Sequence, residues 1–386
     1  MSSETVMYEH MFSLFWEILA GKGGGEMERF ACETMVISGD GALSVLGESP
    51  RKRMLLLTEP EMIRGGQARR IVKAAQNPET EILEHTGREP TMQKAVEGSR
   101  KLKAFQPDLV VALGSGTVLD WGKAAVCFSK VNCILAAVPT AFGFGSEVTD
   151  RVTLSHNGRR HLLRDSTMRP KLALLDSGLI TSSAREEIGE GGFELLAAAL
   201  ESYACGKGGT LSDLHAREAF ASCWAVLPAA FSGNKTARGR LQMVSALAGM
   251  AVDRTGLGLC HAMENSLGTV FGLSRGNAAG ILLPAIIGCN AHAAGRRYAE
   301  LSRAAGMGGS REEIGIRNLK TGLIRLRREL GLPGTLVQAG VDLRSVWNNG
   351  KQIVELTLED PECRNNPVAV DDFMVRRILD EVTGRF

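Results

Sequence analysis

The sequence predicts an α/β N-terminal half built on a parallel sheet, followed by an all-α C-terminal half. Between residues 53 and 176, short apolar runs alternate with helical stretches, a pattern typical of strands joined by crossover helices. After residue 176 the chain becomes alanine-rich and helical in its periodicity. The 386 residues exceed what most single hydrophobic cores contain, so two domains are expected.

Each predicted strand is a short apolar run, and each predicted helix has apolar residues recurring on one face. The strands are expected at 53–58, 109–113, 131–140 and 170–176. The helices of this half are expected at 59–76, at 90–105 and after the turn at 114–117. Strands separated by helices indicate a parallel sheet with right-handed crossovers.

The second half is predicted to contain no strand. Its helical stretches are expected at 191–206, 214–231, 236–272 and 315–333. The boundary is placed near residue 178, which gives an N-terminal extension at 1–30, an α/β domain at 31–178 and an all-helical domain at 179–386. The extension contains MFSLFWEILAG, which predicts an amphipathic helix rather than a signal peptide, because Glu17 interrupts the apolar run.

Composition excludes several classes of function. A formal charge of +2 gives no strong attraction to nucleic acid or membranes, and we expect neither as a partner. Basic clusters such as GRR at 158–160 are expected to be solvated surface. The eight cysteines form no CxxC pair and several lie in apolar runs, which favours reduced core thiols and a cytoplasmic protein.

A glycine turn is the first motif that carries chemistry. Gly114, Ser115, Gly116 and Thr117 lie between a predicted buried strand and a predicted helix. Small residues let backbone amides approach a phosphate, and the start of the helix adds a favourable dipole. The turn therefore predicts a phosphate-binding site, although a plain strand–helix turn would look the same.

Several motifs in the same order resemble the iron-dependent (group III) alcohol dehydrogenases, which are related to dehydroquinate synthase. The similar segments are GSGTVLDWGK, AVPTAFGFGSEVT, PKLALLDSGLI, GGFELLAAALESYA and GLGLCHAMENSLG with SRGNAAGILLP. The resemblance extends from about residue 35 to the C-terminus. It implies a dinucleotide-binding α/β domain, a helical domain, a cleft between them and a homodimer.

The resemblance also implies a set of cofactor-binding residues. These are Glu59, Gly114, Ser115, Gly116, Thr117, Asp120 and Thr140. Glu59 ends a predicted strand where many members carry an acidic residue near the adenosine ribose. A carboxylate there accepts from ribose hydroxyls and repels a 2′-phosphate, so NAD is expected rather than NADP. The alternative is that Glu59 is a solvated loop residue.

The metal site implied by the family is largely substituted. Members that bind iron or zinc use one Asp and three His, and these positions here are Glu194, Ala198, His261 and Arg275. Alanine cannot coordinate, and a guanidinium remains protonated and repels a cation. We therefore expect no divalent metal, although Glu194 and His261 could still combine with Glu264.

Three of these residues are the candidate catalytic groups: His261, Arg275 and Glu194. Arg275 would replace the charge of the metal and hold a carboxylate, phosphate or developing oxyanion, and His261 would act as general acid. The alternatives are a hydrogen-bonded packing histidine, and a structural ion pair of Arg275 with Glu194 or Glu264.

Three further positions depart from the family pattern. Phe142 and Phe144 stand where the family has small residues or threonine, so their rings either pack into the sheet or narrow the nicotinamide pocket. His161 stands near the place of a family lysine, with a surface histidine as the alternative.

The resulting functional hypothesis is a metal-independent, NAD(P)-dependent oxidoreductase acting on a small carbonyl or alcohol that can be anionic. Two alternatives use the same fold. One is a non-redox enzyme, such as a lyase, cyclase or isomerase, rebuilt around Arg275 and His261. The other is a nucleotide-binding protein without catalytic activity.

Overall fold

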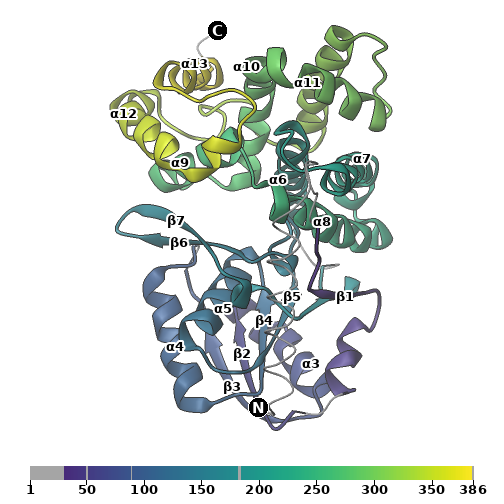
Figure 1. The fold of residues 1–386 in the computed structure, drawn as a ribbon, viewed down its shortest axis with the longest axis vertical. Coiled ribbons are helices and arrows are strands. Elements are labelled where there is room, and N and C mark those ends of the chain that lie inside the picture. The colour runs from purple at the N-terminus through teal and green to yellow at the C-terminus, as the bar shows by residue number, and fades with distance from the viewer. Residues whose placement is uncertain (1–29, 49–50, 88, 181–183, 385–386) are drawn as a thin grey trace, which may run out of the picture. The chain divides into compact units, whose positions relative to one another are not determined.

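The computed structural model of the chain describes residues 30–48, 51–87, 89–180 and 184–384. Residues 32–386 group into one compact unit by their contacts. The amphipathic helix predicted within 1–30 lies outside the described residues. The predicted division into domains at residues 30 and 178 stays a prediction. Figure 1 shows the α/β part and the helical part of the described chain.

Six parallel strands form the main sheet, in the order β1-β8-β5-β4-β2-β3. The strands are β1 (Met35–Ser38), β2 (Arg53–Thr58), β3 (Glu79–Glu84), β4 (Leu109–Gly114), β5 (Ile134–Pro139) and β8 (Leu172–Leu175). The predicted parallel sheet is confirmed. Thr58 pairs with Leu113 and Gly114 with Pro139, so β2, β4 and β5 end at one edge, where open α/β sheets bind their ligands.

Helices cover both faces of this sheet, because the central strands are apolar on both sides. They are α2 (Pro60–Arg64), α3 (Gln67–Ala74), α4 (Met92–Phe105) and α5 (Gly116–Ser129). Leu55 and Leu57 of β2 pack in one cluster with α4 and α5, whereas Met54 and Leu56 pack with α3 on the other face. This alternation is the two-sided burial expected of parallel strands.

Three features of this half differ from the predicted elements. The helix expected at 59–76 is two helices, which are separated at Gly65 and Gly66, and Gly66 has a φ of +81°. Strands β1 and β3 were not predicted, because their side chains are partly exposed at the sheet edges. A separate antiparallel hairpin follows β5 and consists of β6 (Arg151–His156) and β7 (Arg159–Arg164).

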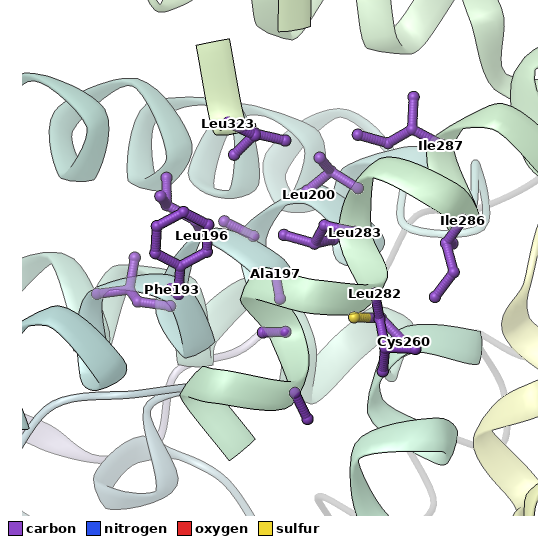
Figure 2. Close-up of a cluster of buried hydrophobic side chains, with 14 of the residues drawn as sticks. Phe193, Leu196, Ala197, Leu200, Cys260, Leu282, Leu283, Ile286, Ile287 and Leu323 are labelled. Atoms are coloured by element: carbon purple, nitrogen blue, oxygen red, sulfur yellow. The ribbon is translucent and has the colours of Figure 1, made fainter. Parts of the chain in front are cut away.

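The described residues after β8 contain helices and no strand, as predicted. The helices are α6 (Arg185–Ala204), α7 (Thr210–Phe231), α8 (Lys235–Thr255), α9 (Leu259–Phe271), α10 (Arg275–Ala304), α11 (Glu312–Glu329), α12 (Leu343–Glu359) and α13 (Asp372–Thr383). Their shared core includes Phe193, Leu200, Cys260, Leu283 and Leu323 from four different helices (Figure 2).

Helix α10 is long and apolar enough to span a membrane by length and composition. However, 78% of its most apolar 18-residue window is buried inside the protein. This burial is that of a core helix, and α10 packs extensively against α6 and α11. Among the described residues, α10 is the only helix that meets the length and composition criteria.

A buried carboxylate joins α6 to the start of α9. Glu201 accepts hydrogen bonds from the backbone amides of Gly258 at 3.0 Å, Cys260 at 2.6 Å and His261 at 3.3 Å. These amides belong to the first turn of α9, where no intrahelical acceptor is available. Burial raises the pKa of Glu201 to about 7, against the lowering effect of the three amides.

We predict that Glu201→Ala destabilises the protein strongly, because it leaves buried amides of α9 without an acceptor. The expected loss in the free energy of unfolding is about 3 kcal/mol, measured by denaturant unfolding. Glu355→Ala is the matched control, since Glu355 is an exposed helical glutamate paired with Lys351, and its loss should cost less than about 0.5 kcal/mol. Equal midpoints for the two variants would show that Glu201 does not stabilise α9.

Candidate active site

A cavity of about 500 Å³ lies at the carboxyl edge of the sheet. Its walls come from the turn after β4, the loop after β5, the β6–β7 hairpin, helix α6 and the start of α10. The charged lining residues are Glu89, Asp120, Glu147, Arg160, Glu187, Glu190, Glu194 and Arg275. The predicted cofactor turn and two of the three predicted catalytic residues therefore face one space.

The glycine turn presents the start of α5 to this cavity. A Cβ on Gly114 would lie 2.8 Å from Val118, whereas a Cβ on Gly116 would meet no atom within 4 Å. Gly114 therefore permits close packing of strand and helix, and Gly116 leaves open space beside the helix N-terminus. Ser115, Gly116 and Thr117 all line the cavity. A helix N-terminus with open space beside it is a position at which backbone amides can hold a phosphate, and the binding of one here stays a prediction.

Glu59 is tied to the glycine turn. Its Oε1 accepts from the Ser115 hydroxyl at 2.5 Å, and the Ser115 amide is 3.4 Å from the same oxygen. Glu59 is half-buried and lies beside the cavity rather than in its lining. Thr140 is also outside the lining, and its backbone amide donates to the Gly114 carbonyl at 3.0 Å.

Asp120 lines the cavity but is engaged by the protein. It accepts from the Ser146 hydroxyl at 2.5 Å and from the Thr153 amide at 3.1 Å. Lys123 lies 3.6 Å from Asp120 and donates to the Thr149 hydroxyl and to the Arg151 carbonyl. Burial lowers the pKa of Lys123, and Asp120 opposes that effect. This network fixes the start of α5 against the segment that follows β5.

Phe142 and Phe144 pack against the helical part of the chain rather than into the sheet. Phe142 is buried in the helical core, and a Cβ on Gly191 would lie 3.2 Å from its ring. Phe144 packs against the cluster of Ala198, Val252 and Leu257. Both phenylalanines line the cavity and narrow it from the helical side.

Arg275 and Glu194 form an ion pair in the cavity wall. The Nη1 of Arg275 is 3.7 Å from Oε1 of Glu194, and their side chains remain 24% and 21% exposed. Burial raises the pKa of Glu194, and the adjacent guanidinium of Arg275 opposes this rise. The ion pair suggested from the sequence is thus present, and it faces the space that a ligand would occupy.

His261 does not face the cavity with these two residues, although the ring of Phe144 lies beside both His261 and Arg275. It is buried, does not line the cavity, and has its Nδ1 3.6 Å from Oε2 of Glu264. Burial and the nearby charges of Arg275, Arg151 and Arg160 hold the pKa of His261 well below its usual value. His261 thus lies beside Glu264 and outside the cavity lining, and its suggested role as general acid stays a prediction.

Arg160 is a cavity residue that the sequence analysis placed on the solvated surface, and that prediction was wrong. Its side chain is 13% exposed, donates to Asn265 at 2.7 Å and forms an ion pair with Glu89. A signal was available in the sequence. Asn157 and Gly158 are typical of a two-residue hairpin turn. Side chains alternate between the two faces of the strand that follows, so Arg160 points to the face opposite the exposed His161.

Glu147 is a second cavity residue that the sequence analysis did not single out. Its carboxyl group is buried, and burial raises its pKa to about 7. His161, in contrast, is exposed on the hairpin, as its surface alternative predicts, and it lines a separate cavity of about 280 Å³.

The residues at the four ligand positions do not fit a divalent metal. Ala198 offers no donor atom, and the guanidinium of Arg275 places a positive charge beside Glu194. Across the ranges that the structure describes, no group of three or more His, Cys, Asp or Glu side chains is arranged to hold a metal ion. The combination of Glu194, His261 and Glu264 is thus not brought together as a ligand set.

Comparison with known proteins agrees with this architecture. Residues 33–177 match the family described as iron-containing alcohol dehydrogenase, and residues 189–383 match the Fe-containing alcohol dehydrogenase family, C-terminal. The 1-propanol dehydrogenase PduQ of Salmonella typhimurium is 30% identical over 370 residues, which cover 92% of this chain and all of that protein. The chain therefore belongs to the iron-containing alcohol dehydrogenase family and is an alcohol dehydrogenase-like oxidoreductase.

Solved structures show the same fold. An iron-containing alcohol dehydrogenase from Thermococcus thioreducens has a TM-score of 0.86 at 25% identity, covering 93% of this chain and all of that one. The sulfoacetaldehyde reductase of Bifidobacterium kashiwanohense, solved in complex with NAD+, has a TM-score of 0.83 at 20% identity. The match covers 94% of this chain and all of the reductase chain. At 20% identity, this match shows a likeness of fold alone.

Proposed function

We propose that the chain is an NAD-dependent oxidoreductase that interconverts a small, anionic carbonyl compound and its alcohol without a resident metal. The observation that carries this proposal is the Arg275–Glu194 pair in the cavity wall. It puts a fixed cation and an ionisable carboxyl group at the two ligand positions that face the cavity.

The nucleotide would bind along the glycine turn. Gly116 leaves open space at the start of α5, and backbone amides there suit a pyrophosphate. Glu59, oriented by Ser115, supports NAD over NADP because a carboxylate beside the ribose would repel a 2′-phosphate. When bound, the nicotinamide cofactor would donate or accept the hydride.

Arg275 would bind the anionic group or the reacting oxygen of the substrate. The 3.7 Å separation from Glu194 is an ion-pair contact rather than a short hydrogen bond, which allows the guanidinium to donate to a substrate oxygen as well. Arg160 adds positive charge to the same cavity, although Glu89 and Asn265 already engage it. Six acidic side chains line the same cavity, so the proposed preference for a negatively charged substrate rests on the position of Arg275 and not on the overall charge of the lining.

Glu194 would exchange the proton that accompanies hydride transfer. In carbonyl reduction, its protonated carboxyl group gives a proton to the oxygen that receives the electron pair of the carbonyl bond. In alcohol oxidation, the carboxylate takes the hydroxyl proton. Burial raises the pKa of Glu194, so the protonated form persists to a higher pH than in an exposed glutamate.

Nucleotide binding tests the first step of the proposal. In a fluorescence titration, we expect NADH to bind and NADPH to bind at least about tenfold more weakly. Gly116→Val should weaken NADH binding by more than about tenfold by filling the space at the start of α5. Gly350→Val is the matched control, because a Cβ at Gly350 also meets no atom within 4 Å. Absence of binding by both nucleotides would sink the proposal.

Replacement of Arg275 tests the anion-binding role. We expect Arg275→Ala to lower kcat/KM for glyoxylate by about 100-fold, since a fixed charge at the reacting group is lost. The effect on propanal, which has no carboxylate, should be smaller. Arg296→Ala is the control on the same helix, because the Arg296 side chain is 87% exposed. Equal turnover of glyoxylate by Arg275→Ala and the wild type would exclude an anion clamp.

The pH dependence tests the role of Glu194. The raised pKa of Glu194 means that the proton donor is present at low pH and is lost as pH rises through that pKa. We therefore expect kcat/KM for carbonyl reduction to fall with rising pH, and the fall to disappear in Glu194→Gln. Glu187→Gln is the control, because Glu187 lines the same cavity but is not among the charges that shift the pKa of Glu194. A pH profile unchanged in Glu194→Gln would assign the proton to another group.

A further inference from the structure

The ring of Phe144 lies among the positions that hold the metal in other family members. It packs against the cluster that contains Ala198, and its centroid is 5.9 Å from that of the His261 ring at an interplanar angle of 76°. The guanidinium carbon of Arg275 is 5.3 Å from the same phenyl centroid. The ring therefore lies beside His261 and Arg275 and packs against the small cluster to which Ala198 belongs, and the remaining position, Glu194, is paired with Arg275.

The backbone that carries Phe144 is held on both sides. The amide of Gly143 donates to the Ser245 hydroxyl at 3.2 Å, and a Cβ on Gly143 would lie 3.1 Å from the Glu194 carboxyl carbon. Gly145 has a φ of +79°, and a Cβ there would lie 2.4 Å from the Ser245 carbonyl oxygen. The loop therefore has no room to withdraw toward α6 or α8, and the Phe144 ring is directed between them.

The contacts of this ring are those of a packed aromatic group. An edge-to-face arrangement with His261 at 5.9 Å brings the two rings to van der Waals contact. A zinc ion needs an imidazole nitrogen at roughly 2.1 Å and further donors around it. The phenyl ring lies against the His261 ring and beside the guanidinium of Arg275, so an apolar group and a cation are the neighbours here, where a metal site needs donor atoms.

We propose that Phe144 fills the space of the family's metal site, and that its ring and an imidazole at position 198 exclude one another. Ala198 is the small residue that makes room for the ring. The resemblance places threonine at position 144 and histidine at position 198, so the volume lost at 198 is taken up by the ring at 144. This inference extends the proposed metal independence but does not require nucleotide binding or turnover.

Zinc binding by two ligand-restored variants tests the proposal. The first carries Glu194→Asp, Ala198→His and Arg275→His, and the second adds Phe144→Thr. After dialysis against zinc chloride and removal of excess metal, we expect about one zinc per chain in the second variant only. The first variant and the wild type should hold less than about a tenth of that, by elemental analysis. Equal zinc content in the two variants, or none in both when folded, overturns the proposal.

Thermal unfolding provides a test that needs neither metal nor four substitutions. Ala198→His should lower Tm by about 5 °C or more, because the imidazole and the phenyl ring compete for one space. Phe144→Thr should also lower Tm, through lost packing. The double variant should nevertheless melt at a higher temperature than Ala198→His alone. Phe144→Thr would then raise Tm in the Ala198→His background and lower it in the wild type, so the two effects would not be additive.

Ala197→His is the matched control for this cycle, because Ala197 is buried in the main helical core rather than in the cluster beside Phe144. Adding Phe144→Thr to Ala197→His should lower Tm further. If Phe144→Thr lowers Tm equally in the wild type and in Ala198→His, the two side chains do not compete and the proposal is wrong.

Discussion

The close backbone contact between Gly145 and Gly249 is the constraint on which the candidate site depends. A Cβ on Gly145 would lie 2.5 Å from the Gly249 Cα, and a Cβ on Gly249 would lie 2.4 Å from the Gly145 carbonyl oxygen. The loop after β5 and helix α8 can approach this closely only because both positions are glycine. The contact fixes the loop that carries Phe144, and Phe144 in turn packs beside Arg275 and His261.

A second fixed point joins this loop to the nucleotide side of the cavity. Lys123 is fully enclosed, and its ammonium donates to Ser146 and Thr149 while Asp120 lies 3.6 Å away. The start of α5 and the segment after β5 are therefore held together by charge-assisted hydrogen bonds in a buried environment. The two walls of the cavity keep their spacing because these contacts and the glycine contact act on neighbouring parts of one loop.

The sequence predicted the fold well wherever burial was complete. Strands β2, β4 and β5 are apolar on both faces, so continuous apolar runs located them, whereas β1 and β3 are half-exposed and produced no such run. The ordered motifs identified the family, whereas the substitution of the ligand positions stays a prediction from the same motifs. The contact of Phe144 with the regions around Ala198, His261 and Arg275 could not be predicted, because it joins four segments that are distant in sequence.

The packing of Phe144 also bears on how this site could change. If the Phe144 ring and an imidazole at position 198 compete for one space, as proposed, a chain that carries both loses stability, so the residues at 144 and 198 are coupled. Under the same proposal, a histidine introduced at 198 alone would meet Phe144 before any metal could bind. A single substitution is then not enough to build a metal site here, because positions 144 and 198 have to change together.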